Sequence, residues 1–161
     1  RNKTYQVKQQ LQGYKADGVT EIAKEDLLYT DADFLIPAAL EGQITADNAD
    51  RVKAKYIVEG ANGPTSYEAD QILNAKGKIV VPDILANAGG VIVSYFEWVQ
   101  NLQSLSWSLE EVNNKLADIL LKAFDEVYGL TEERGYPMRT SAYIIALRRL
   151  VKTKKIRGIF P

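Results

Sequence analysis

The sequence predicts an α/β fold in which a parallel sheet is followed by C-terminal helices. Up to about residue 80, short β-branched or aromatic runs alternate with helix-like segments, as in consecutive βα units. From about Ala88 the pattern is helical, and we find no internal repeat, low-complexity tract or long linker. With 161 residues, 46% apolar and 25% charged, we expect one soluble, single compact unit.

Three short apolar runs predict the strands, at residues 33–37, 55–59 and 78–82. Such runs are buried on both faces in a parallel sheet, so we expect helices on both sides. Residues 45–53 and 65–76 are the predicted crossover helices.

The second crossover helix carries a clear start signal. Thr65 and Glu68 have the spacing of a capping box, and Gly77 ends the segment. Before the first strand, residues 7–11 and 25–28 predict a helix and a short helix separated by a loop.

The first helix after the sheet has an apolar stripe at helical spacing. Its members are Val91, Tyr95, Trp98 and Leu102. We expect the aromatic residues Tyr95, Phe96 and Trp98 to pack in the core or against another domain rather than to stack on bases.

A longer helix follows, with a capping box of Ser108 and Glu111 at its start. Residues 135–137, Gly-Tyr-Pro, break the chain, and a last helix is predicted at about 140–152. The apolar face of the longer helix is formed by Val112, Leu116, Ile119, Leu120, Ala123, Phe124, Val127 and Tyr128. The last helix is expected to bury Ala142, Ile145, Ala146 and Leu150 or their neighbours.

Composition excludes several kinds of chemistry. The chain has no cysteine and no histidine, which excludes disulfides, thiolate chemistry and imidazole metal ligands or acid–base groups, and we predict no metal. No apolar run is long enough to span a bilayer, and no signal peptide pattern occurs at the start, so we expect a cytoplasmic protein without a membrane partner.

The net charge of -1 provides no general attraction for nucleic acid, and we predict no nucleic-acid partner. The end of the chain is locally basic, but cations near a helix C-terminus are favoured by the helix dipole. These cations are Arg148, Arg149, Lys152, Lys154, Lys155 and Arg157.

Small or amide residues follow each predicted strand, at 37–39, 60–64 and 83–90. The carboxyl ends of parallel strands share one edge, where small residues allow a flat ligand such as a nucleotide to approach the backbone. Asn62 and Asn87 can both donate and accept hydrogen bonds there. Any one of these motifs is more often only a turn, whereas three in register favour a ligand site.

The helix after this edge has a polar face made of Ser94, Glu97 and Asn101. Ser94 lies one turn from Gly89 and Gly90 and could face a ligand. An isolated helix serine more often bonds the carbonyl four residues earlier, and Glu97 could equally be solvated or ion-paired.

Long runs of the sequence resemble glutamate dehydrogenases, within the family of glutamate, leucine, phenylalanine and valine dehydrogenases. The main runs are 58–65 and 82–101, and 36–45 and 157–161 resemble the same family. Leucine, valine and phenylalanine dehydrogenases also resemble this chain at residues 87–90. In the place of Ser94-Tyr95-Phe96-Glu97-Trp98, however, they carry a different and less polar segment, so the glutamate dehydrogenases are the preferred match. The resemblance implies the second half of a partial Rossmann-like sheet.

That resemblance also implies reversible deamination of L-glutamate to 2-oxoglutarate and ammonia, with hydride passed to NAD or NADP, in a homo-oligomer that is a hexamer. Val91 and Ser94 match substrate contacts, with the Ser94 hydroxyl directed at the side-chain carboxylate. The positions that match the cofactor site are Ala39, Gln43, Gly60, Ala61, Asn62 and Asn87.

Two features of the family pattern do not occur in the sequence. No G-x-G-x-x-G motif is present, and the lysines and aspartate that move protons in this family belong to an N-terminal domain, so we place no catalytic residue in this chain. We expect residues 1–86 to form an incomplete NAD(P)-binding domain and 87–161 to form helices that return toward the substrate cleft. We therefore expect this chain to be the C-terminal part of such an enzyme and to be inactive on its own. The alternative is that it is a short non-catalytic relative that binds a nucleotide or regulates a partner subunit.

Overall fold

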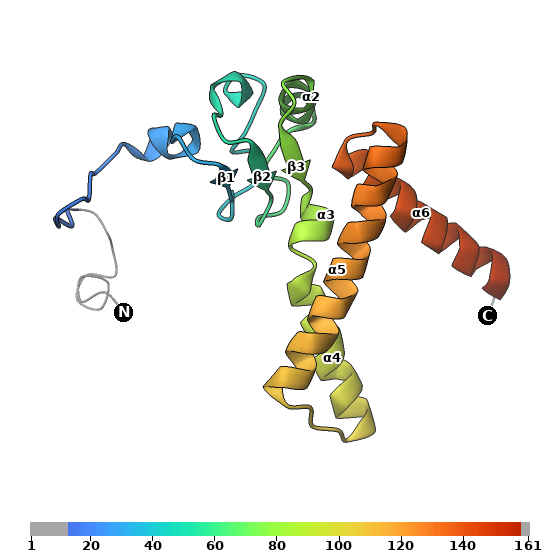
Figure 1. The fold of residues 1–161 in the computed structure, drawn as a ribbon. Helices are drawn as coiled ribbons and strands as arrows, with labels where there is room; N and C mark the ends of the chain where they lie inside the picture. Colours follow the sequence, from blue (N-terminus) through green and yellow to red (C-terminus); the bar gives the residue numbers. More distant parts are fainter. Residues whose placement is uncertain (1–12, 159–161) are drawn as a thin grey trace.

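The computed structural model describes residues 13–158, and Figure 1 shows their arrangement. The strands β1 (Phe34–Leu35), β2 (Tyr56–Val58) and β3 (Ile79–Val81) form a parallel sheet in the order β1-β2-β3. The predicted α/β fold with parallel strands is therefore confirmed. The helix predicted at 7–11 lies outside the described residues, whereas the short helix at 25–28 is the 3-10 helix η1 (Lys24–Tyr29).

The crossover between β1 and β2 is not the helix predicted at 45–53. Only the 3-10 helix η2 (Ala49–Arg51) forms there. The side chain of Asn48 accepts from the backbone N–H of Thr45 at 2.8 Å and donates to the carbonyl of Gln43 at 2.9 Å. These local bonds stabilise a turn at the expense of the helical backbone pattern.

The crossover between β2 and β3 is the helix α2 (Tyr67–Ala75), which begins later than predicted. Its N-cap is Ser66, whose hydroxyl accepts from the backbone N–H of Ala69 at 3.2 Å, so the predicted Thr65 cap is wrong. Thr65 instead forms a parallel bridge with Ile44, and its hydroxyl is buried without a hydrogen-bond partner.

Helices follow β3 to the end of the described chain. They are α3 (Asp83–Ala86), α4 (Gly89–Gln103), α5 (Leu109–Arg134) and α6 (Met138–Arg157). Figure 1 shows α4 leading away from the sheet and α5 running back toward the sheet alongside α4. The predicted capping box is present: the N–H of Glu111 donates to the Ser108 hydroxyl, and the N–H of Ser108 donates to the Glu111 carboxylate.

The last helix is longer than the predicted 140–152, because Pro137 already serves as its N-cap and the helix continues to Arg157. Ala142 is buried and Ile145 and Ala146 are half-buried, as expected. Leu150 is 67% exposed and its neighbour Val151 50%, so the predicted burial there is wrong: the second half of α6 runs away from α5, as Figure 1 shows. Of the described helices, none combines the length and apolarity that crossing a membrane requires.

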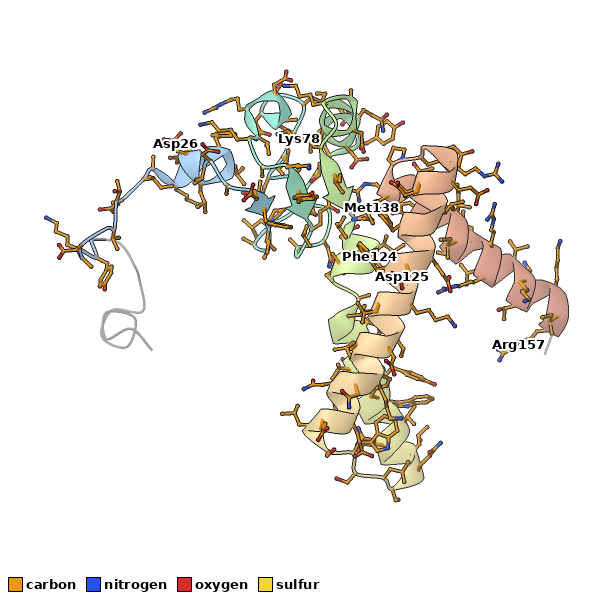
Figure 2. All side chains as sticks on the ribbon, viewed as in Figure 1. Asp26, Lys78, Phe124, Asp125, Met138 and Arg157 are labelled. Carbon is orange, nitrogen blue, oxygen red and sulfur yellow. The ribbon has the colours of Figure 1, made fainter. Side chains whose placement is uncertain are left out.

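Two apolar clusters lie on opposite faces of the sheet. Alternation along β3 directs Val80 to one cluster and Ile79 and Val81 to the other. The second cluster joins the sheet to α3, α5 and α6, and Figure 2 labels its Met138. The buried members of the first cluster are Ile44, Ala49, Val52, Ala54, Ile57, Ala69, Leu73 and Val80. The buried members of the second cluster are Leu85, Val127, Met138 and Ala142.

Part of the second face is not covered by any residue of the described chain. Phe34 of β1 is 61% exposed, and an open apolar hollow of about 560 Å³ lies between β2 and α5, with Phe124 and Tyr128 in its lining. Figure 2 labels Phe124 at this place. The prediction that all three strands are buried on both faces is therefore wrong for β1 within residues 13–158.

The predicted apolar stripe of α4 is exposed. Val91, Tyr95, Trp98 and Leu102 each expose more than half of their surface. Phe96, on another side of the helix, is the buried aromatic residue of α4. Its ring packs edge-on against the ring of Trp107, with 5.6 Å between the ring centroids. Phe96 is thus core, as expected, whereas Tyr95 and Trp98 are not core in the described part of the chain, and their packing against another domain stays a prediction.

Candidate functional site

A hollow of about 830 Å³ lies at the carboxyl ends of the strands. It is open, and residues from the loops after β1 and β2 line it together with the start of α4. All of the predicted site residues except Gln43 belong to this lining. The lining residues are Ala39, Leu40, Glu41, Gly60, Ala61, Asn62, Asn87, Gly90, Val91 and Ser94.

The two asparagines meet at this hollow. The amide nitrogen of Asn87 donates to the amide oxygen of Asn62 at 2.7 Å. Asn87 is the C-cap residue of α3, and Asn62 lies in the loop after β2. This pairing does not use the nitrogen of Asn62 or the oxygen of Asn87, so one donor group and one acceptor group remain for a ligand.

The loops after β1 and β2 lie against each other at Gly60. The N–H groups of Gly60 and Ala61 both donate to the carbonyl of Pro37, at 3.1 and 2.9 Å. A Cβ atom added to Gly60 would lie 3.0 Å from the Cβ of Ala38, closer than real Cβ atoms normally approach. Glycine therefore favours this close contact of the loops, because a larger residue would displace Ala38 by a few tenths of an ångström.

Gln43 does not line the hollow. Its side-chain amide is used inside its own turn, where it donates to the carbonyl of Glu41 at 3.2 Å. The sequence could not indicate this, because a glutamine two residues after a glutamate is equally compatible with an outward-pointing side chain.

Ser94 lines the hollow, and it also forms the hydrogen bond to the carbonyl four residues earlier that is usual for an isolated helix serine. Its hydroxyl donates to the carbonyl of Gly90 at 2.9 Å. Val91, between these two residues on the same side of α4, is 76% exposed. An exposed hydroxyl of this kind can still accept a hydrogen bond from a ligand or turn to donate to one.

Behind the hollow, Arg139 at the start of α6 meets three carboxylates that sequence reasoning missed. Its guanidinium lies 2.6 Å from Glu59, 3.3 Å from Asp70 and 3.4 Å from Asp83. Glu59 is 0% exposed and Asp70 only 2%. We call these four residues the Arg139 cluster.

The Arg139 cluster left a weak signal in the sequence. Glu59 is the last residue of one predicted strand and Asp83 directly follows the next, at the end of the sheet where functional side chains often lie. Arg139 is 80 residues from Glu59 and 56 from Asp83, so no local pattern connects them.

Burial and the nearby groups of opposite charge act in opposite directions on the pKa values of Asp70 and Arg139. Burial raises the pKa of Asp70, although the charge of Arg139 opposes this. Burial alone would lower the pKa of Arg139, but its hydrogen bond to Glu59 and the charges of Glu59 and Asp70 raise that pKa overall. The guanidinium therefore stays charged. In residues 13–158 no group of three or more carboxylates is arranged to hold a metal ion.

Residues 2–158 match the family model of the Glutamate/Leucine/Phenylalanine/Valine dehydrogenases. The chain belongs to this family. The glutamate dehydrogenase of Thermotoga maritima is 57% identical over 140 residues, which are 87% of this chain and 34% of that protein. A hetero-hexameric glutamate dehydrogenase from Thermus thermophilus, solved with Leu bound, superposes with a TM-score of 0.85 at 35% identity, over 98% of this chain and 36% of the other.

Relatives within the family are named for different cofactors. An NADP-specific glutamate dehydrogenase of Synechocystis is 54% identical, over 86% of this chain and 32% of its own length. An NAD-specific glutamate dehydrogenase of Staphylococcus aureus is 52% identical, over 85% of this chain and 33% of its own length. The chain thus spans about a third of the length of the curated relatives that it matches.

Proposed function

We propose that this chain forms the nicotinamide side and part of the substrate pocket of an enzyme that reversibly deaminates L-glutamate to 2-oxoglutarate and ammonia with NAD or NADP. The observation that supports this most is the hollow at the strand ends, where Asn62, Asn87 and Ser94 lie together among small residues. Open α/β sheets bind ligands at this edge.

In this proposal, Asn62 and Asn87 bind the polar groups of the nicotinamide and its ribose, and Ala39, Gly60 and Ala61 form the small residues against which the cofactor lies. The unused donor of Asn62 and acceptor of Asn87 suit an amide or a hydroxyl. Bound NAD(P) supplies the hydride chemistry. For Gln43 to contact the cofactor, its side chain would have to release the hydrogen bond to the carbonyl of Glu41.

The substrate side of the proposal is the exposed face of α4. Val91 contacts the carbon chain of glutamate, and the Ser94 hydroxyl turns from the Gly90 carbonyl to donate to the side-chain carboxylate. An amino acid with an apolar side chain would leave this hydroxyl without its ligand partner, which disfavours it.

Proton transfer in this proposal is the task of residues outside the described chain. Hydride transfer requires substrate and cofactor in near-attack geometry, and this chain supplies only one wall of that arrangement. We further propose a homo-hexamer in the cytoplasm; the Thermus thermophilus relative is named hetero-hexameric.

Ser94→Ala in the full-length protein is expected to raise the KM for L-glutamate about 10- to 100-fold, since a hydrogen bond to a charged group contributes about 1.5–3 kcal/mol. The KM for NAD(P) should change less than about twofold, because Ser94 faces the substrate in the proposal. Steady-state kinetics with each reactant varied in turn measures both constants.

The control is Ser106→Ala, since Ser106 is exposed in the turn after α4 and does not line the hollow. Equal effects of Ser94→Ala on both reactants would remove Ser94 from the substrate site. Nucleotide binding by the full-length protein without any turnover would favour the non-catalytic, nucleotide-binding alternative.

A further inference from the structure

We infer that Asp83 is a positioning residue: held by Arg139, its carboxylate fixes the loop after β2 against α3 so that Asn62 and Asn87 meet at the hollow. The inference rests on the proposed function, because it concerns the proposed cofactor site. It adds two residues, Asp83 and Arg139, that do not line that site.

The carboxylate of Asp83 bonds two backbone segments. One oxygen accepts from the N–H of Gly63 at 2.8 Å, and the other accepts from the N–H of Ile84 at 2.7 Å. Gly63 directly follows Asn62, and Ile84 lies in the short helix that ends at Asn87. Asp83 therefore connects the two chain segments that carry the asparagine pair.

Glu59 and Arg139 hold Asp83 in this place from behind. The second oxygen of Glu59 accepts from the N–H of Asp83 at 2.8 Å, while its first oxygen binds Arg139 at 2.6 Å. Arg139 binds Asp83 through its other terminal nitrogen, at 3.4 Å. The planar fork of arginine thus contacts both carboxylates at once, which a lysine could not do in the same geometry.

Asp70 provides an internal comparison. It also binds Arg139, at 3.3 Å, and it is buried in the same cluster. Its side chain belongs to α2, and among the hydrogen bonds of residues 13–158 none joins its carboxylate to the loop at 60–63. A purely stabilising cluster would make Asp70 and Asp83 equivalent, whereas positioning of the asparagine pair singles out Asp83.

The test compares Asp83→Asn with Asp70→Asn in the full-length protein, because each change keeps the shape of the side chain and removes its charge. Binding of NADH and NADPH is measured by fluorescence titration, and thermal unfolding is measured in parallel. Asp83→Asn is expected to raise the dissociation constant on the order of tenfold, as loss of a charge-assisted hydrogen bond would. Asp70→Asn should change it less than about twofold, while both lower the Tm.

Arg139→Lys is a second variant that keeps the positive charge and loses the fork. It should weaken cofactor binding in the same direction as Asp83→Asn. Equal dissociation constants for the Asp83→Asn and Asp70→Asn proteins would overturn the inference, as would unchanged binding in both Asp83→Asn and Arg139→Lys.

Asn87→Ala separates this inference from the proposed function. If Asn87→Ala weakens cofactor binding and Asp83→Asn does not, the positioning role is wrong and the proposed site stands. If Asn87→Ala leaves cofactor binding unchanged, the proposed site itself is wrong, and the positioning role with it.

Discussion

Arg139 is surrounded by three carboxylates, and the ionisation of one of them, Asp70, affects the stability of the folded protein. Burial of Asp70 costs free energy whenever its carboxylate is charged, and this is why its pKa is raised in spite of Arg139. The folded protein holds the Asp70 proton more tightly than the unfolded chain does. Stability linked to Asp70 therefore falls as the pH rises from the unfolded pKa, about 3.9, toward the raised folded pKa.

Asp70→Asn should remove this part of the pH dependence. The free energy of unfolding of the variant, minus that of the unchanged protein, is expected to increase as the pH rises from about 4, because the variant has no carboxylate to ionise at this position. Urea unfolding at a series of pH values measures the difference. A difference that falls over the same range would contradict the raised pKa.

At the scale of elements, the N-cap of α2 is Ser66, one residue after the predicted Thr65. The backbone N–H of Ile44 donates to the carbonyl of Pro64, and that of Ser66 donates to the carbonyl of Ile44, both at 2.8 Å. These bonds keep Thr65 extended, so the helix starts only after Ser66. The Ser108 capping box was predictable because that residue pairs with no neighbouring segment in the described structure.

Replacement of each hydroxyl distinguishes the two caps. Ser66→Ala is expected to lower the free energy of unfolding by about 1 kcal/mol, the usual contribution of an N-cap side chain. Thr65→Val keeps the shape and removes a buried hydroxyl without a partner, so stability should stay equal or rise. Denaturant unfolding of both variants measures these changes. A larger loss of unfolding free energy in Thr65→Val than in Ser66→Ala would mean that Thr65 is the N-cap, as the sequence predicts.

At the scale of the whole molecule, features that depend on the parallel sheet could be predicted from the sequence, and contacts between distant segments could not. Parallel strands place their carboxyl ends together, so Gly60, Asn62 and Asn87 could be predicted to meet. The partners of Arg139 could not, because a contact across 80 residues leaves no periodic pattern. The division into residues 1–86 and 87–161 stays a prediction.

The uncovered apolar face predicts the behaviour of the 161-residue chain in solution. Phe34, on a strand without a described neighbour beyond it, is 61% exposed beside the apolar hollow. We expect the purified chain to self-associate in sedimentation equilibrium, because open edges and apolar patches favour contact between copies.

Phe34→Thr should weaken this association, since it shortens the apolar side chain and keeps a residue favoured in strands. Tyr67→Thr, at an exposed aromatic position at the start of α2, is the matched control and should leave the association unchanged. A wild-type chain that stays monomeric at high concentration would contradict the prediction.

We expect the Arg139 cluster to influence the order of events in folding. Glu59 is completely buried and needs a charged partner, and that partner is supplied 80 residues later in the chain. Until α6 docks, the ends of β2 and β3 cannot adopt their final form without an uncompensated charge. The long loop closed by this contact slows that step. We therefore expect the edge of the sheet that carries the proposed site to be completed late, only after a helix that does not line this site has docked.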